Sequence, residues 1–245
     1  TVVAWSSGVD EALQRECDNT GVTLARMEDG FIRSVGLGSD FNWPYSLVVD
    51  RKGIYYDPSR PSELEDICNA MPEHPDHTAL LERAAALRAL ILDKGLTKYN
   101  TGFRAALPPK FPKEKTLVLV PGQVEDDASV RCGGFGMSNP DVLRAAREAR
   151  PDAFIIYKPH PDVESGNRQG AIPDADVLRH ADLILRDFPM GRLLPLVHEV
   201  HTLTSQTGFE ALLRGVKVFT YGGPFYAGWG LTEDRQTFPR RKARL

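Results

Sequence analysis

The stretch "VHTLTSQTGFEALLRGVKVFTY", residues 200–221, decides the fold class. Residues 200–203 predict a short strand, residues 205–214 predict a helix that ends at Gly215, and residues 216–221 predict a second strand. A strand, a helix and a strand in immediate succession form the unit from which parallel sheets are built. We therefore expect an α/β protein.

The same alternation extends upstream of this stretch. Strands are predicted at 116–120, 153–157 and 181–185, and a helix opened by Asn139-Pro140 is predicted to run through Arg150. The segment "LPPKFPKEK", residues 107–115, is rich in proline and charge and is the predicted linker. These features indicate two Rossmann-like lobes, residues 1–106 and 116–245, with a cleft between them.

The first half of the chain has a less regular pattern. Ser62 and Glu65 match a helix-start box in which each side chain bonds to the backbone of the other. A helix over 78–92 carries Leu80, Ala84, Leu87 and Ile91 on one face, which we expect to pack in the core. The other predicted elements are strands at 2–5 and 23–27, a helix at 10–17, and a hairpin of 46–49 with 53–56.

Composition excludes several classes of protein. With 245 residues, 42% hydrophobic and 26% charged, the chain is an ordinary globular sequence. Its net charge of −3 argues against nucleic-acid binding, and no apolar run is long enough to span a membrane. Cys17, Cys68 and Cys132 lie far apart, which indicates reduced thiols in a cytosolic protein. The chain begins at Thr1 inside a predicted strand, which indicates a fragment.

Two segments suggest a pocket for a phosphate. The helix start at Thr204-Ser205 offers unpaired N–H groups, Gly208 would let a ligand approach, and Glu210 could accept bonds from ribose hydroxyls. An ordinary Ser/Thr cap is the alternative. The second segment is "YKPHPD", residues 157–162, where Lys158 and His160 follow a strand. If the strands are parallel, both segments lie at the same edge of the sheet.

Acidic side chains follow two other predicted strands. In "GQVEDDAS", residues 122–129, three interpretations stay open: a solvated turn, a metal site through Glu125 and Asp127, or a carboxylate that acts as nucleophile or base. In "MEDGFIRSVGLGSD", residues 27–40, Glu28 would face the cleft, and Arg33 could bind a substrate carboxylate. An Asp-Gly turn with Arg33 in a surface ion pair is the alternative.

Two further segments near the end of the chain have open roles. The aromatic residues of "PFYAGWG", residues 224–230, either line a sugar or base pocket or pack the seam between the lobes. The basic "RRKAR", residues 240–244, is either a solvated tail or a contact for anionic lipid headgroups.

Together these segments resemble the bacterial capsule-polysaccharide β-Kdo transferases of the KpsC type, which implies a GT-B-like glycosyltransferase fold. The resemblance spans nearly the whole chain, in family order, and indicates one module of a longer polypeptide. Part of the acceptor side would then be missing at the N-terminus. The matching stretches are "EDGFIRSVGLG" (28–38), "SLVVDRKGIYYDPSRPSELE" (46–65), "TKYN" (97–100), "LVPGQVEDDAS" (119–129), "PDAFIIYKPHPDVESG" (151–166), "HEVHTLTSQTGFEALLRG" (198–215) and "TYGGPFYAGWGLTED" (220–234).

The resemblance implies a retaining enzyme that moves Kdo, an acidic eight-carbon sugar, from CMP-Kdo to a β-Kdo linker on a lipid acceptor. It implies Asp127 as nucleophile, with Asp126 as a rival, and Glu28 as acid/base. Residues 1–106 would form the acceptor side and residues 116–245 the CMP-sugar side. The other implied roles are CMP binding by Lys158, His160, Pro161, Thr204, Ser205, Gly208 and Glu210, and contacts to the sugar or its carboxylate by Arg33 and Gln123.

The expected partners follow from the same resemblance. CMP leaves as a monophosphate, which a histidine, a lysine and a helix dipole can stabilise, so no metal or other cofactor is expected. We expect a cytoplasmic protein with a Kdo-terminated glycolipid acceptor and a peripheral contact with the inner membrane. Two alternatives stay open: a sialyltransferase-like enzyme that uses another CMP-sugar, and a non-catalytic module that binds nucleotide or oligosaccharide.

Overall fold

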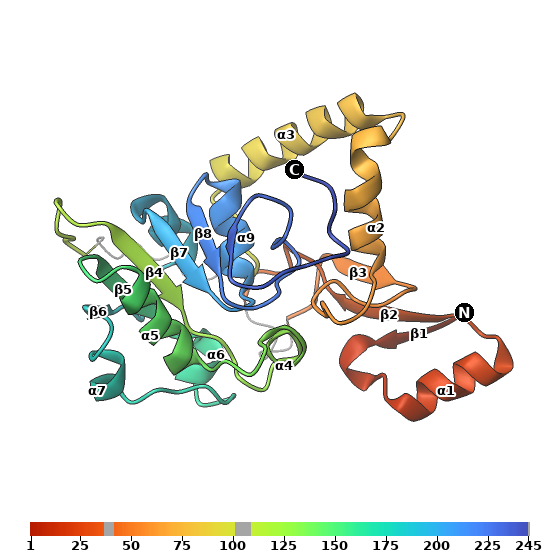
Figure 1. The fold of residues 1–245 in the computed structure, drawn as a ribbon, viewed down its shortest axis with the longest axis horizontal. Coiled ribbons are helices and arrows are strands. Elements are labelled where there is room, and N and C mark those ends of the chain that lie inside the picture. The colour runs from red at the N-terminus through yellow and green to blue at the C-terminus, as the bar shows by residue number, and fades with distance from the viewer. Residues whose placement is uncertain (37–41, 101–108, 245) are drawn as a thin grey trace.

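Two sheets organise the protein, whose computed structural model describes residues 1–36, 42–100 and 109–244 (Figure 1). Within these residues the larger sheet has six strands in the order β6-β5-β4-β7-β8-β9, and every neighbouring pair is parallel. The parallel α/β sheet predicted from the sequence is therefore confirmed. Its strands are β4 (Leu117–Pro121), β5 (Phe154–Lys158), β6 (Leu183–Ile184), β7 (Glu199–Thr202), β8 (Lys217–Thr220) and β9 (Glu233–Asp234).

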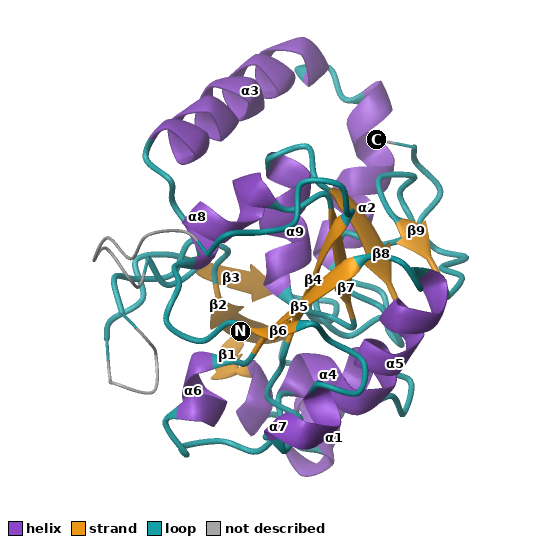
Figure 2. Cartoon of the chain, turned by 90° about the vertical axis from the view of Figure 1, so that its left-hand side faces the viewer, coloured by secondary structure: helices purple, strands orange, loops and turns teal. Residues whose placement is uncertain are grey.

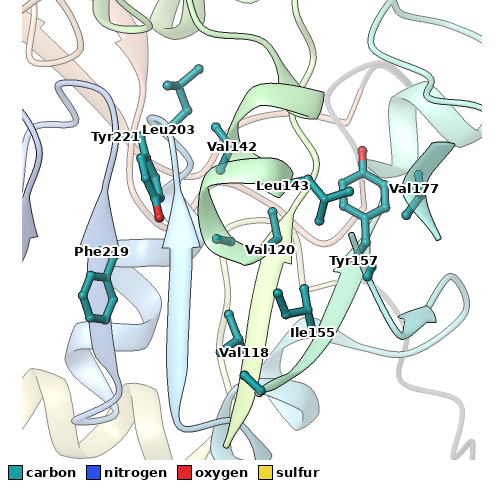
Figure 3. Packing of buried hydrophobic residues seen from close by; sticks show 13 residues of the cluster. Val118, Val120, Val142, Leu143, Ile155, Tyr157, Val177, Leu203, Phe219 and Tyr221 are labelled. Carbon is teal, nitrogen blue, oxygen red and sulfur yellow. The ribbon is translucent and has the colours of Figure 1, made fainter. Parts of the chain in front are cut away.

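Helices cover both faces of the larger sheet (Figure 2). On one face, Val118 and Ile155 pack against Val142 and Leu143 of α5 (Asn139–Ala149), as Figure 3 shows. On the other face, Leu119 packs with residues of α8 (Met190–Leu193) and α9 (Gln206–Leu213). Because successive side chains of a strand point to opposite faces, a strand buried on both faces is apolar throughout. This explains the unbroken hydrophobic run of β4.

Each of the three central strands is followed, after a short turn, by a helix. β4 leads into α4 (Ala128–Gly133), β5 into α6 (Pro161–Glu164), and β7 into α9. In a parallel sheet these strand ends meet at one edge, which is where ligands bind in open α/β folds. The remaining short helices within the described residues are α7 (Asp174–Val177) and the 3-10 turns Ser6–Gly8, Met71–Glu73 and Leu194–Leu196.

The smaller sheet is mixed rather than Rossmann-like. β1 (Val2–Trp5) and β2 (Leu24–Asp29) are parallel and joined by α1 (Glu11–Thr20), whereas β3 (Leu47–Asp50) is antiparallel to β2. The predicted hairpin of β3 with residues 53–56 is wrong. The carboxylate of Asp50 accepts bonds from the N–H groups of Lys52, Gly53 and Glu63, which turns the chain away before a second strand forms.

Helix α3 (His77–Asp93) lies along the outside of the protein (Figure 1). The prediction that its apolar face packs in the core is wrong, because Ile91 is its only buried residue and Leu87 is 52% exposed. Periodicity identifies an apolar face but not a partner for it. Among the described residues no helix, α3 included, has the length and hydrophobicity that a membrane crossing requires.

Aromatic side chains join the two sheets at their seam. Phe31, from the loop after β2, stacks on Phe225 with ring centroids 4.5 Å apart, and it lies 5.6 Å from Phe209 of α9. Tyr55 packs edge-on against Phe31 and Phe225 at 5.2 and 5.6 Å. Of the two roles left open for 224–230, Phe225 therefore takes the packing role.

The C-terminal segment returns to α2 (Glu63–Ala70) in the first half of the chain. Arg240 and Arg241 bind the two carboxylate oxygens of Glu65 at 2.8 and 3.0 Å. The interpretation of 240–244 as a solvated tail is wrong, because Arg241 is 4% exposed. Arg240 and Arg241 are thus used within the fold, which removes two of the four basic side chains from which a lipid contact was predicted. The first half of the predicted helix-start box is confirmed, because Ser62 Oγ accepts the Glu65 N–H. The carboxylate of Glu65, however, binds Arg240 and Arg241 rather than the backbone of Ser62.

The substitution Glu65→Ala tests the attachment of this segment. We expect it to lower the free energy of unfolding by about 3 kcal/mol, because the buried guanidinium of Arg241 would lose its carboxylate. The control is Asp66→Ala, which removes an exposed pair with Lys52 and is expected to change the free energy of unfolding far less than Glu65→Ala does. Urea denaturation measures both, and equal losses would contradict the role given to Glu65.

The boundary between the two parts is only partly described. The predicted linker, 107–115, begins within residues 101–108, which lie outside the described residues. In its described part, the ring of Phe111 packs against Phe154 at the start of β5, with centroids 6.2 Å apart. That part of the predicted linker is therefore attached to the second core.

Candidate functional site

Gln123 connects two of the turns at the carboxyl edge of the larger sheet. Its Oε1 accepts bonds from the N–H groups of Thr204 and Ser205 at 2.9 and 3.1 Å, and its Nε2 donates to Thr204 Oγ1 at 2.8 Å. Gln123 is buried, so these bonds fix the turn after β4 against the start of α9. The predicted contact of Gln123 with a sugar stays a prediction.

Asp127 and Ser205 each cap a helix at this edge. Asp127 Oδ1 accepts from the N–H and hydroxyl of Ser129 at 2.9 and 2.6 Å, while Ser205 Oγ accepts from the Thr207 N–H at 3.2 Å. The hydroxyls of Ser129 and Thr204 lie 3.3 Å apart, so a chain of polar contacts joins the two caps. No described residue donates a hydrogen bond to Asp127 Oδ2, which leaves this oxygen for a ligand.

His160 follows β5 and is held as a neutral imidazole. Its Nδ1 accepts the N–H of Asp162 at 3.1 Å, so the ring proton lies on Nε2. Burial lowers the pKa of His160, the Asp162 carboxylate opposes this change, and the charge of Lys98 lowers the pKa further. The residue therefore offers a neutral N–H donor near pH 7. Pro161, the first residue of α6, has no N–H of its own to be bonded there.

Lys158 is used within the fold. Its Nζ donates to the main-chain carbonyl of Arg186 at 2.6 Å, and the side chain is buried beneath the edge of the sheet. Burial lowers the pKa of Lys158. Its predicted contact with CMP stays a prediction, but the bond to Arg186 gives it a structural partner already.

Glu28 brings a second carboxyl group to the site from the smaller sheet. It belongs to β2, and its Oε1 accepts the N–H of Asp29 at 3.0 Å. Burial raises the pKa of Glu28, and the charges of Asp29 and Asp127 raise it further. Asp126, the rival of Asp127, is paired with Arg168 on the surface.

Lys98 is the site residue that the motif analysis missed. Its N–H donates to Glu210 Oε1 at 2.7 Å, and its carbonyl accepts the N–H groups of Arg33 and Ser34 at 2.8 and 3.2 Å. Its charge opposes the rise that burial causes in the pKa of Glu28. Only the short "TKYN" stretch drew attention to this position, and nothing in it distinguishes Lys98 from a loop lysine.

Arg33 is buried within the first half of the chain. Its Nε donates to Asp29 Oδ2 at 2.6 Å, and its Nη1 donates to Ser34 Oγ and to the Asn42 carbonyl at 3.1 and 2.8 Å. These bonds match neither a surface ion pair nor a guanidinium held ready for a ligand. Its predicted contact with a substrate carboxylate is not tested, but the geometry favours a structural role.

Gly208 and Glu210 occupy the first turns of α9 and face other parts of the fold. A side chain at Gly208 would collide with the Tyr226 hydroxyl, so packing of Tyr226 accounts for the glycine without a ligand. Glu210 is buried, and its Oε1 accepts the Lys98 N–H. The predicted bond of Glu210 to a ribose hydroxyl would have to use its other oxygen.

The substitution Glu210→Gln tests how much the ionisation of this buried carboxyl group lowers the stability of the fold. Burial raises the pKa of Glu210 to about 7 in the folded protein, above its unfolded value of about 4.3. The folded state therefore loses stability as the pH rises from about 4.3 to 7. We expect the glutamine variant to be more stable than wild type by about 2 kcal/mol at pH 8, and the gain to shrink below pH 5.

Urea denaturation at both pH values measures this difference, and the exposed Glu148→Gln is the control. A gain for Glu210→Gln that does not change with pH would contradict the explanation.

Metal ligation finds little support in the geometry. Within 1–36, 42–100 and 109–244, no three histidine, cysteine or acidic side chains gather as a metal site would require. Glu125, the second acid of the metal interpretation, accepts the N–H of Asn139 at 3.2 Å. The absence of a metal requirement stays a prediction.

Comparison with known proteins gives the family. A sequence model described as "Capsule polysaccharide biosynthesis protein" matches residues 1–101 and 74–245. The chain belongs to this family. Two relatives are the capsule polysaccharide modification protein LipA of Neisseria meningitidis serogroup B, 48% identical over 100% of this chain, and the lipopolysaccharide-processing protein LpsZ of Rhizobium meliloti, 43% identical over 98%. The chain spans 34% and 54% of their lengths.

Solved structures agree with this assignment. The beta Kdo 2,4 transferase of Thermosulfurimonas dismutans KpsC has a TM-score of 0.86 and 35% identity, with 100% of this chain and 75% of that one covered. The beta Kdo 2,7 transferase of the same KpsC has a TM-score of 0.75 and 36% identity, with 99% and 71% covered. The resemblance to KpsC proteins drawn from the sequence motifs is confirmed.

Proposed function

We propose that the chain is a two-lobed, GT-B-like module of a retaining β-Kdo transferase that uses CMP-Kdo in capsule polysaccharide biosynthesis. The observation that carries this proposal is the similarity of 99% or more of this chain to the two Kdo transferase structures of KpsC, at 35% and 36% identity. The chain supplies the carboxyl groups of Glu28 and Asp127, together with the Nε2–H of His160, whose Nδ1 accepts the N–H of Asp162. Two carboxyl groups beside a neutral N–H donor are what a double displacement at a sugar phosphate needs.

In the first displacement, a carboxylate oxygen of Asp127 attacks the anomeric carbon of Kdo. The bond from this carbon to the phosphate oxygen of CMP breaks, and its electron pair leaves with CMP. The N–H of His160 and the positive end of the α9 dipole stabilise the departing phosphate, since the N–H groups of Thr204, Ser205 and Thr207 already have acceptors within the fold. The bonds from Ser129 hold Asp127 in place during the attack.

In the second displacement, an acceptor hydroxyl attacks the same carbon and Asp127 departs as a carboxylate. Glu28 takes the proton of that hydroxyl. Two inversions restore the original configuration, so a β-linked donor gives a β-linked product. The acceptor is a Kdo-terminated glycolipid, which the module meets at the cytoplasmic face of the inner membrane.

A donor comparison tests the proposal. The chain is incubated with a Kdo-terminated acceptor and either CMP-Kdo or CMP-sialic acid, and the product is analysed by NMR. We expect transfer of Kdo with a β linkage and a preference over the other donor of at least about a hundredfold. A preference for CMP-sialic acid would favour the sialyltransferase-like alternative, and CMP binding without transfer from either donor would favour a binding module.

A further inference from the structure

Helix α9 presents one row of side chains to the first half of the chain. Gln206, Glu210 and Arg214 follow one another at intervals of four residues, so they lie along the same side of the helix and its C-cap. Each forms a hydrogen bond with a main-chain group of the first half. The bonds join Gln206 Nε2 to the carbonyl of Phe31, Glu210 Oε1 to the N–H of Lys98 at 2.7 Å, and Arg214 Nη2 to the carbonyl of Leu96 at 3.0 Å. The helix is therefore tied to the first half along its whole length.

The first bond of this row lies where the two parts of the candidate site meet. Gln206 is the first residue of α9 and follows Ser205, whose N–H is held by Gln123 at 3.1 Å. Its partner, Phe31, lies two residues beyond the end of β2, the strand that carries Glu28. The bond therefore connects the turn before α9, which belongs to the larger sheet, with the segment that follows Glu28.

The segment between Glu28 and this bond is itself fixed. The carbonyl of Asp29 accepts the hydroxyl of Tyr55 at 3.2 Å, and the N–H of Gly30 donates to the carbonyl of Ser46 at 2.9 Å. A segment that is packed and hydrogen-bonded in this way moves as a unit rather than bending freely. A shift of the carbonyl at one end would therefore displace the carboxyl group of Glu28 at the other.

The aromatic contacts at the seam do not supply the same precision. The ring of Phe31 packs on Phe225 and Phe209, and this burial of apolar surface holds the two halves together. Apolar burial is non-directional, whereas a hydrogen bond weakens steeply as its angle falls toward about 120°. The bond of Gln206 is therefore the contact that fixes how the loop after β2 sits against the start of α9.

We propose that Gln206 is a positioning residue that sets the place of the Glu28 carboxyl group relative to the sugar on Asp127. This inference rests on the proposed function, because it takes Glu28 as the group that accepts the proton of the acceptor. The first displacement uses Asp127 and His160, which both belong to the second half of the chain. The second displacement also needs Glu28, from the first half. Loss of the Gln206 bond should therefore slow the second displacement and spare the first.

The test compares wild type with Gln206→Met, which keeps the length and the helix propensity of the side chain but cannot donate a hydrogen bond. Gln236→Met is the matched control, because Gln236 Nε2 also donates to a main-chain carbonyl, that of Tyr221 at 3.3 Å, within the second half. Rapid-quench kinetics measures CMP release from CMP-Kdo without acceptor and, after a Kdo-terminated acceptor is added, transfer of Kdo from the enzyme. Calorimetry measures the affinity for CMP.

We expect Gln206→Met to lower the rate of transfer to the acceptor by about tenfold or more, because a small displacement of a reacting group slows the step steeply. The burst of CMP release and the affinity for CMP should stay at wild-type values, as should all three properties of Gln236→Met. In the Glu28→Gln background, Gln206→Met should slow transfer little further, because both changes remove the same function. A purely structural glutamine would produce neither the split between the two steps nor this non-additivity.

Equal losses in both steps, or a full additional loss in the Glu28→Gln background, would overturn this proposal and leave the proposed function intact. A Gln206→Met enzyme that transfers Kdo at the wild-type rate would do the same. If wild type neither releases CMP from CMP-Kdo nor transfers Kdo, the proposed function fails and this inference fails with it. Circular dichroism verifies the fold of each variant, and Gln206→Ala is judged by the same outcomes should Gln206→Met not fold.

Discussion

The substitution Asp127→Asn is expected to lower kcat by about 10⁴-fold or more, because the amide cannot attack the anomeric carbon. The variant should fold normally. Asparagine is as good an N-cap as aspartate, and its side-chain oxygen can still accept the Ser129 N–H that Asp127 Oδ1 accepts now. The measurement is the initial rate of transfer from CMP-Kdo, with circular dichroism to verify the fold.

The neighbouring Asp126→Asn is the control for this experiment. Asp126 is exposed and paired with Arg168, so the Asp126→Asn variant is expected to transfer Kdo at a rate near that of wild type. Mass spectrometry of wild type incubated with CMP-Kdo but no acceptor should reveal Kdo attached at residue 127. Attachment at residue 126, or a large loss of rate in Asp126→Asn alone, would reverse the assignment of the nucleophile.

The parallel sheet was predictable because its signals are local. The strand "TLVLV", the cap at Ser205 and the glycine at 215 each act within a few residues, and the structure places strands and helices near those bounds. The smaller sheet was harder to predict. The bonds of Asp50 to three N–H groups, one of them at Glu63, replace the hairpin that residues 46–56 suggest.

For the candidate site, the sequence could not predict which side chains have partners within the fold. Gly208 and Arg33 are residue types that bind ligands, but Tyr226 and Asp29 are their neighbours in the fold. Lys98 gains its place through Glu210, 112 residues away, and no local pattern encodes such a contact. A motif therefore identifies where chemistry is concentrated, whereas tertiary contacts decide which of its side chains are left for a substrate.

Glu28→Gln is expected to lower kcat by about 10²- to 10⁴-fold, because the amide cannot take the proton of the acceptor hydroxyl. The wild-type rate should rise with pH as Glu28 loses its proton. That rise should lie above the range of an ordinary glutamate, because burial and the nearby acids raise the pKa of Glu28. The glutamine variant should lack this limb of the pH profile.

Stability separates a loss of chemistry from a loss of fold in this variant. A carboxyl whose pKa is raised in the folded protein makes the fold less stable as the pH rises through that pKa. Glu28→Gln removes this effect, so it should be at least as stable as wild type at pH 7 while its rate collapses. Glu73→Gln, an exposed carboxyl, is the control and should change neither property. A Glu28→Gln enzyme that keeps the ascending limb of its pH profile would show that another group accepts the proton.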